Sequence, residues 1–366
     1  MNNRIRFPEL DLLRFLAACA VMLFHYTFRA SLDHAWSGSF PVLSQISKYG
    51  YLGVHLFFLL SGFVILLTAS HKDAVGFCFA RMIRLYPAYW ICVTLSTLTI
   101  FLAHKSHSIT LPQYLTNLSL LQSFVGIRDI SGVYWTLAME LKFYFLIFLI
   151  LLLRQISRIR YWLGIWLVAS LVLSLQPPHG IARFFLFPEW SSYFIAGAMF
   201  YLIHREGPSA YKLAIILGCY GLSLGYALNL LPTAAGHGSF EVNFPVVIGA
   251  IGLFYLVFLA LALKPRAEPH SNSFYRIGLL TYPLYLLHQD IGYLLLHLAP
   301  SGLNRFLVLS LVSAVAIGLA SLILIPERWI ARRLKAFLAR LQRSAAYAPA
   351  SRPALLNSAP STTEAP

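Results

Sequence analysis

The sequence ELDLLRFLAACAVMLFHY, residues 9–26, is an almost unbroken apolar run. As an α-helix that rises about 1.5 Å per residue, a segment over 10–28 crosses most of a hydrocarbon layer about 30 Å thick. Apolar stretches of similar length recur to the end of the chain, so the pattern predicts an all-α integral membrane protein with about ten transmembrane helices. The other stretches lie at 51–69, 86–103, 134–153, 161–176, 189–203, 211–230, 244–263, 278–298 and 305–325.

The composition leaves no room for a separate soluble domain. Of the 366 residues, 58% are hydrophobic and 11% are charged, against about 25% charged residues in a typical soluble domain, and the mean hydropathy is +0.70. We therefore predict one membrane domain over residues 7–343 in a multi-pass protein of the cell inner membrane. The remaining residues, 344–366, are rich in Ala, Pro and Ser and are predicted to form a disordered cytoplasmic tail.

The basic residues predict the orientation. The net charge is +15, but Lys and Arg fall in short clusters between apolar stretches, a pattern that sets topology and attracts anionic membrane lipids rather than nucleic acid. With both termini in the cytoplasm, most of these clusters lie on the cytoplasmic side. They comprise Arg4 and Arg6, Lys72 with Arg81 and Arg84, Arg154 to Arg160, Arg205 with Lys212, Lys264 to Arg276, and Arg328 to Arg352.

One polar segment interrupts the apolar pattern. Residues 104–133 are too polar to cross the membrane and too long for a simple turn. We expect them to form an outer-face or re-entrant element over a cavity, since irregular backbone at membrane depth is tolerated only where protein or water covers it.

Ionisable residues inside the apolar stretches are energetically costly and therefore indicate function or pairing. Arg14 and His25 are eleven residues apart, so they share one helix face about 16 Å apart. That separation is close to the reach of an extended pantetheine arm, and histidine is the commonest proton shuttle near neutral pH. In the alternative interpretation, Arg14 extends to the inner interface and His25 lies among the lipid headgroups.

A second pair of arginines lies at the inner end of the third stretch. Arg81 and Arg84 are three residues apart and are therefore neighbours on one helix face. Two guanidinium groups can bind a phosphate-bearing ligand through forked hydrogen bonds. Alternatively, the pair could be ordinary cytoplasmic anchors.

The fourth stretch contains an acidic residue. Glu140 lies about 9 Å deep if the helix begins at the outer face near Tyr134, and Trp135 and Tyr144 flank it in sequence. This depth matches that of His25, so we expect Glu140 to orient the imidazole and to stabilise its protonated form. A structural pair of Glu140 with Lys142 is disfavoured, because residues two apart do not face each other on a helix.

The ninth stretch carries the sequence TYPLYLLHQD, residues 281–290. Tyr285 and His288 share a helix face there, and His288 lies about 15 Å deep by helical rise, close to the membrane midplane. They could line the path of a substrate, although a histidine packed in the core would also explain His288.

Together, these motifs resemble the acyltransferase type 3 family of bacterial membrane O-acyltransferases. The resemblance covers about residues 7–330, with the motifs in the family order. It rests on LDLLRFLAACAVMLFHY (10–26), GVHLFFLLSGFVI (53–65), ARMIRLYPAYW (80–90), YWTLAMELKFYF (134–145) and TYPLYLLH (281–288).

The resemblance implies transfer of an acyl group, usually acetyl, from cytoplasmic acyl-CoA to a hydroxyl of a carbohydrate, such as a surface polysaccharide or its lipid-linked precursor. Acetyl-CoA would be a co-substrate, and no metal is expected. The residue roles follow the motifs. His25 and Glu140 are the expected catalytic residues, Arg14, Arg81 and Arg84 the donor-binding residues, and Trp135, Tyr144, Tyr285 and His288 the substrate-binding residues.

Other functions stay open at the level of sequence. A polyprenyl-linked glycosyltransferase should carry acidic residues in its first outer loop, and residues 29–50 contain only Asp33. A transporter or flippase would also explain buried charges, but it would move its substrate without using acyl-CoA. A membrane acyltransferase of another class is chemically closer and differs mainly in lacking the ordered arginine and histidine motifs.

Overall fold

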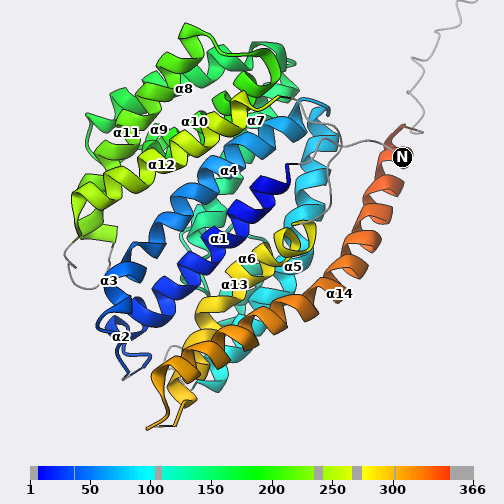
Figure 1. Cartoon of the computed structure of the whole chain (residues 1–366). Helices are drawn as coiled ribbons and strands as arrows, with labels where there is room; N and C mark the ends of the chain where they lie inside the picture. The colour runs from blue at the N-terminus through cyan, green and yellow to red at the C-terminus, as the bar shows by residue number, and fades with distance from the viewer. Residues whose placement is uncertain are drawn as a thin grey trace, which may run out of the picture.

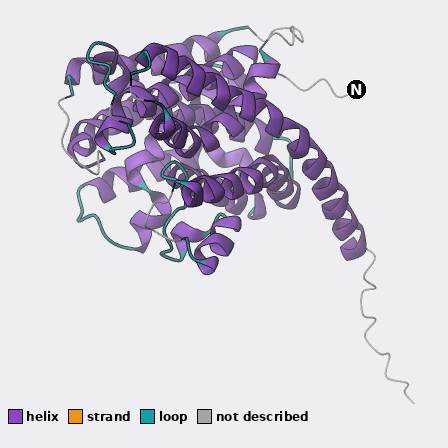
Figure 2. Ribbon diagram, turned by 90° about the horizontal axis from the view of Figure 1, so that it is seen from below, coloured by secondary structure: helices purple, strands orange, loops and turns teal. Residues whose placement is uncertain are grey.

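The computed structural model describes residues 7–36, 38–103, 109–234, 242–265, 274–300 and 302–346. Within these ranges every regular element is helical, as Figure 2 shows, which confirms the predicted all-α fold. Ten of the helices have sixteen or more residues. They are α1 (Pro8–Phe24), α4 (Leu52–Ala69), α5 (Ala74–Leu102), α7 (Trp135–Leu152), α8 (Ile159–Ser174), α10 (Pro188–Glu206), α11 (Ala210–Ala234), α12 (Phe244–Leu263), α13 (Tyr275–Leu298) and α14 (Arg305–Ala346).

In the described part of the chain, eight helices are long and apolar enough to cross a membrane. The other two predicted ranges correspond to α10 and α13, which have 19 and 24 residues. These two helices are largely buried inside the bundle and carry polar residues there. Their apolar stretches are therefore less hydrophobic than those of the other eight helices. The chain is a multi-pass membrane protein.

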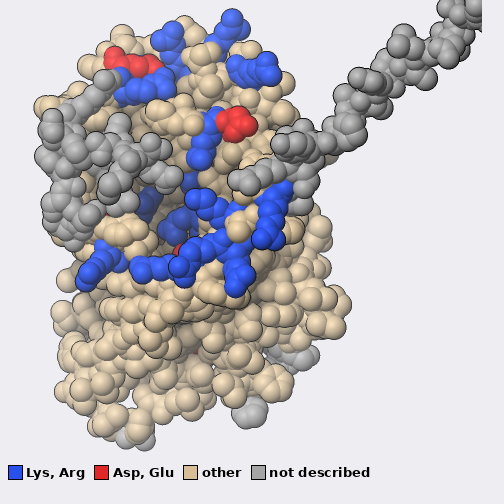
Figure 3. Space-filling view, turned by 90° about the vertical axis from the view of Figure 1, so that its right-hand side faces the viewer, with Lys and Arg blue, Asp and Glu red and all other residues tan. Residues whose placement is uncertain are grey.

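The two ends of the bundle differ in charge. In Figure 1, α1 begins and α14 ends at the same upper end of the molecule, as an even number of crossings requires. Figure 3 shows Lys and Arg gathered in the upper half of one face, around a hollow, and almost no charge in the lower half. This distribution matches the positive-inside pattern. Helix α14 continues to Ala346, across the expected domain boundary at residue 343, and 347–366 lie outside the described residues.

The third helix is longer than the sequence indicated. We expected the third crossing at 86–103, whereas α5 begins at Ala74, where the Asp73 carboxylate accepts a hydrogen bond from the Gly76 amide at 3.0 Å. Arg81 and Arg84 make the first turns of α5 less hydrophobic, so these turns were not part of the predicted apolar stretch. Arg81 and Arg84 therefore lie well inside a helix rather than at its end.

Helices α4 and α10 pack at the centre of the bundle through two glycines. A Cβ atom on Gly62 would lie 2.2 Å from the Phe194 carbonyl oxygen, and one on Gly197 would lie 2.0 Å from the Leu59 carbonyl oxygen. The two backbones therefore approach too closely for any side chain at these positions, as is common between membrane helices.

This close approach predicts the effect of a single substitution. Gly197→Val should force α4 and α10 apart and destabilise the fold by several kcal/mol, because backbone rather than a flexible side chain must move. We expect a lower melting temperature in detergent and loss of the monodisperse peak in size-exclusion chromatography. The control is Gly221→Ala in α11, where no atom lies within 4 Å of the added Cβ. Equal stability of the two variants would contradict this packing.

The polar segment after α5 is folded against that helix. It contains α6 (Leu111–Leu118), and the buried Asn117 amide donates to the Gln113 and Arg128 carbonyls and accepts from the Ile130 amide. The Trp90 indole of α5 donates to the Leu118 carbonyl at 3.0 Å. The described part of the predicted 104–133 element thus covers the end of the bundle where α5 ends and α7 begins, while 104–108 lie outside the described residues.

Candidate active site

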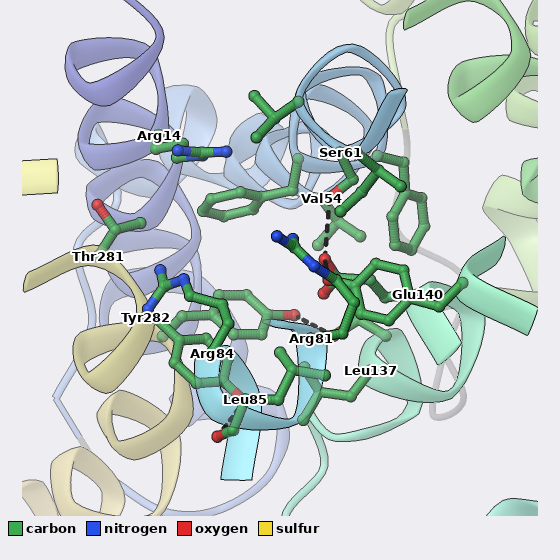
Figure 4. A pocket seen from close by; sticks show the side chains of 17 residues that line it. Arg14, Val54, Ser61, Arg81, Arg84, Leu85, Leu137, Glu140, Thr281 and Tyr282 are labelled. Carbon is green, nitrogen blue, oxygen red and sulfur yellow. Dashed lines mark hydrogen bonds between the residues drawn. The ribbon is translucent and has the colours of Figure 1, made fainter. Parts of the chain in front are cut away.

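A partly open pocket of about 210 Å³ lies between α1, α4, α5, α7 and α13 (Figure 4). The guanidinium groups of Arg14, Arg81 and Arg84 point into it from α1 and α5, and the Glu140 carboxylate faces them from α7. Because three cations meet one carboxylate on its walls, the pocket favours an anionic ligand.

Two of the arginines are held by acidic residues behind the pocket wall. Arg14 lies 3.4 Å from Asp11, one turn earlier on α1. Arg84 lies 3.8 Å from Glu327 of α14, and its guanidinium carbon is 5.2 Å from the centre of the Tyr282 ring. Neither ion pair uses all the donors of its guanidinium group, so both arginines keep N–H groups for a ligand.

Arg81 has no carboxylate partner within ion-pair distance among the described residues. Its guanidinium carbon lies 5.8 Å from the Phe77 ring centre and 5.7 Å from the Tyr144 ring centre, and its buried Nε has no hydrogen-bond partner in the described part of the chain. A buried guanidinium donor without an acceptor is costly. Among the three arginines, Arg81 is therefore the one whose burial cost an anionic ligand would lower most.

The Glu140 carboxylate is fixed by two neighbours. Its Oε1 accepts hydrogen bonds from the Tyr144 hydroxyl, one turn later on α7, and from the Ser61 hydroxyl of α4 at 3.3 Å. No hydrogen bond joins Glu140 to His25 in the described residues. The expected direct contact between these two side chains is thus not observed, because Glu140 faces the arginine pocket.

His25 is paired with His288 instead. His25 Nδ1 lies 3.1 Å from His288 Nε2, and the same Nδ1 lies 2.9 Å from the Val21 carbonyl oxygen. His288 is fully buried, and its Nδ1 lies 2.8 Å from the Tyr285 carbonyl oxygen. The two imidazole groups therefore form a dyad that links α1 to α13.

The carbonyl partners assign the tautomers of the dyad. A carbonyl oxygen can only accept, so Nδ1 carries the proton in both neutral rings. His288 then presents a bare Nε2, and the single His25 Nδ1–H is shared between that nitrogen and the Val21 carbonyl oxygen, while His25 keeps a bare Nε2. That nitrogen carries the lone pair a general base needs. When it takes a proton, the Nδ1–H still donates to His288 and holds the ring in place.

A tyrosine connects the dyad to the pocket. Tyr285 lines the pocket, and its hydroxyl lies 3.0 Å from that of Thr136 on α7. Its ring centre lies 5.7 Å from that of His288.

His25 also begins a π-helical turn, His25–Arg29, after the regular part of α1. Such turns occur often at functional sites.

The tertiary structure thus divides the predicted site residues into three groups. Arg14, Arg81, Arg84, Glu140, Tyr144 and Tyr285 line one pocket, and His25 and His288 form the dyad behind Tyr285. Trp135 lies outside the pocket and packs on Trp190, with ring centres 5.1 Å apart.

Sequence reasoning gave no site role to three further residues. Ser61 and Tyr282 line the pocket, and Glu327 binds Arg84 from behind. Glu327 is the only acidic residue of the basic sequence 326–343, which was a usable signal, whereas no sequence feature gave Ser61, inside the motif 53–65, a role of its own. Among the described residues, no group of three His, Cys, Asp or Glu side chains is placed to hold a metal ion.

Comparison with known proteins identifies the class. The sequence profile described as an acyltransferase domain matches residues 7–325, so the chain belongs to the acyltransferase type 3 family. The chain is therefore a membrane acyltransferase, and the expectations of a transporter, a flippase or a glycosyltransferase lose their support. No solved structure matches it.

Three named relatives are similar to the chain. An Acidianus two-tailed virus protein whose name presents it as a candidate acetyltransferase is 24% identical over 77% of this chain and 82% of its own length. Nodulation protein 10 of Rhizobium leguminosarum bv. viciae is 30% identical over 37% of this chain and 41% of its own. Acyltransferase MdmB of Streptomyces mycarofaciens is 30% identical over 38% of each chain.

Proposed function

We propose that the protein transfers an acyl group, acetyl in the first instance, from cytoplasmic acyl-CoA to a hydroxyl of a carbohydrate, such as a surface polysaccharide or its lipid-linked precursor. The observation that carries this proposal is the position of Tyr285, which lines the arginine pocket and whose ring centre lies 5.7 Å from that of His288 in the dyad. The arginine pocket suits an anionic donor, and the histidine dyad suits removal of a proton from the acceptor hydroxyl.

The arginine pocket is suited to the phosphate-bearing part of the donor. Arg81 and Arg84 lie one turn apart on α5 and point into the same space as Arg14. A pyrophosphate group held there would leave the pantetheine arm to extend along α1. His25 lies eleven residues beyond Arg14, about 16 Å along the helix axis. An extended arm of that length brings the thioester to the dyad.

The dyad then supplies the chemistry of transfer. The acceptor hydroxyl oxygen attacks the thioester carbonyl carbon, a C–O bond forms and the C–S bond breaks. His25 Nε2 takes the hydroxyl proton and returns it to the leaving sulfur, which departs as the thiol. His288 acts through His25 and is a positioning residue. Glu140 acts on the donor side, where it holds Tyr144 beside Arg81.

A direct experiment tests this function. Purified protein in lipid nanodiscs is incubated with acetyl-CoA labelled in the acetyl group and with glycans extracted from cells that lack the gene. We expect label in the glycan fraction, and mass spectrometry should locate one added acetyl group per modified sugar. Release of free coenzyme A without a labelled glycan would contradict a carbohydrate acceptor, and no use of acetyl-CoA would contradict the donor.

The positioning role of His288 predicts a graded loss of activity. His288→Ala removes one of the two acceptors of the His25 Nδ1–H and leaves the Val21 carbonyl oxygen. It should lower kcat about tenfold to a hundredfold, the range of one hydrogen bond to a charged group. His288→Gln offers a side-chain oxygen in its place and should retain more activity. The KM for acetyl-CoA should not change in either variant, whereas a merely structural role would lower stability and affect both parameters.

A further inference from the structure

A second pocket lies on the opposite face of α7 from the arginine pocket. It is an open pocket with a volume of about 370 Å³, bordered by α7, by α9 (Ile181–Leu186) and by the first turn of α10. Its polar lining consists of Lys142, Arg183 and Glu189, and Trp190 forms one wall. Lys142 follows the first residue of α7 by seven positions, about 10 Å along the helix axis.

Lys142 is buried without a polar partner. Only 5% of the side chain is exposed, and its Nζ lies 3.9 Å from the centre of the Phe184 ring. No hydrogen bond or ion pair joins Lys142 to another described residue. By contrast, Lys212 is equally buried, but its Nζ binds the Gly207 carbonyl at 2.9 Å and the Glu206 carboxylate at 3.1 Å.

The other two charges of the pocket neutralise each other. Arg183 donates to the Glu189 carboxylate at 2.7 Å, to the Leu173 carbonyl at 2.7 Å and to the Tyr226 hydroxyl at 3.3 Å. The arginine and the carboxylate thus satisfy one another, and the pocket keeps one positive charge on Lys142. The Lys142 ammonium borders this open pocket, where an anion would pair with it.

The surroundings of the pocket are apolar and exposed. Large hydrophobic side chains on α7, on α9 and at the end of α8 face outward around it. Trp190 packs on Trp135 beside the pocket, with ring centres 5.1 Å apart. A ligand would therefore enter from the lipid phase. The exposed fractions are 44% for Phe145, 89% for Leu175, 79% for Ile181, 37% for Phe184 and 40% for Phe185.

We propose that this pocket binds the phosphate group of a membrane lipid, with Lys142 as its cationic partner and the lipid chain lying along Phe145 and Phe185. A phosphate ester supplies the missing negative charge, and an apolar tail matches the exposed rim. The phosphate belongs either to an ordinary phospholipid or to a polyprenyl-linked acceptor. The polyprenyl-linked case rests on the proposed function, and the phospholipid case does not. Binding tests the pocket in both cases without an activity assay.

Native mass spectrometry of the full chain released from detergent tests the proposal. The protein is titrated with a C55 polyprenyl phosphate, with phosphatidylglycerol and with uncharged diacylglycerol. We expect at least one of the phosphate lipids to bind more than tenfold more tightly than diacylglycerol. Lys142→Met and Lys142→Gln should each lose that preference, and Lys142→Arg should keep it. The control Lys264→Met removes an exposed lysine that lines neither pocket and should bind as the wild type does.

The outcomes separate the two lipid sources. Preference for polyprenyl phosphate over phosphatidylglycerol identifies a lipid-linked acceptor, and equal binding identifies a structural phospholipid. Lack of any preference for phosphate lipids in the wild type would overturn the proposal, even if no Lys142 variant could be purified. Undiminished phosphate preference in either the Met or the Gln variant would overturn it as well.

Discussion

His25→Ala should abolish acyl transfer, with a loss of about a thousandfold or more in kcat. The substitution removes the only Nε2 lone pair that the dyad presents, and general-base catalysis contributes about 10²–10⁴ to such rates. Labelled acetyl transfer to glycan in nanodiscs measures the effect. The melting temperature in detergent serves as the control, because the variant also loses the His25 contact between α1 and α13 and must be shown to be folded.

The double variant separates catalysis from positioning. If His25 and His288 act as one unit, adding His288→Ala to His25→Ala should cost almost no further activity, because effects within a unit are not additive. Independent losses that multiply would assign His288 to another role. Transfer by folded His25→Ala at near the wild-type rate would rule out the dyad as the base.

Replacing Arg81 and Arg84 together by Gln should raise the KM for acetyl-CoA about a hundredfold or more. Each guanidinium group is expected to make at least one charge-assisted hydrogen bond to phosphate, and such bonds contribute about 1.5–3 kcal/mol each. The KM for the glycan acceptor should stay within about twofold, because both arginines lie at the donor end.

Competition experiments check this assignment. Coenzyme A should inhibit the wild type more strongly than dephospho-coenzyme A or pantetheine, and the double variant should lose that ranking. Arg205→Gln provides a matched control, because Arg205 lies near the same end of the bundle, beside Glu206, and lines neither pocket. An unchanged KM for acetyl-CoA in the folded double variant would remove the arginines from the donor site.

The sequence alone determined the fold class and the residue types of the site. Ten apolar stretches predicted the ten long helices, because a membrane-crossing helix must satisfy its backbone internally and present an apolar surface to lipid. The cost of burying charge singled out Arg14, His25, Arg81, Arg84 and Glu140 for the same reason. The ordered motifs then predicted the family that the profile match shows.

Only the tertiary structure decided which of these side chains meet. His25 and His288 are 263 residues apart in sequence and touch because α1 packs on α13. Glu140 turns toward Ser61 and Tyr144, since rotation of α7 about its axis is fixed by its neighbours rather than by its own apolar pattern. The same rotation sends Lys142 into a separate pocket. Helical rise gives the depth of a residue, but the face it presents to its partners depends on how the helices pack.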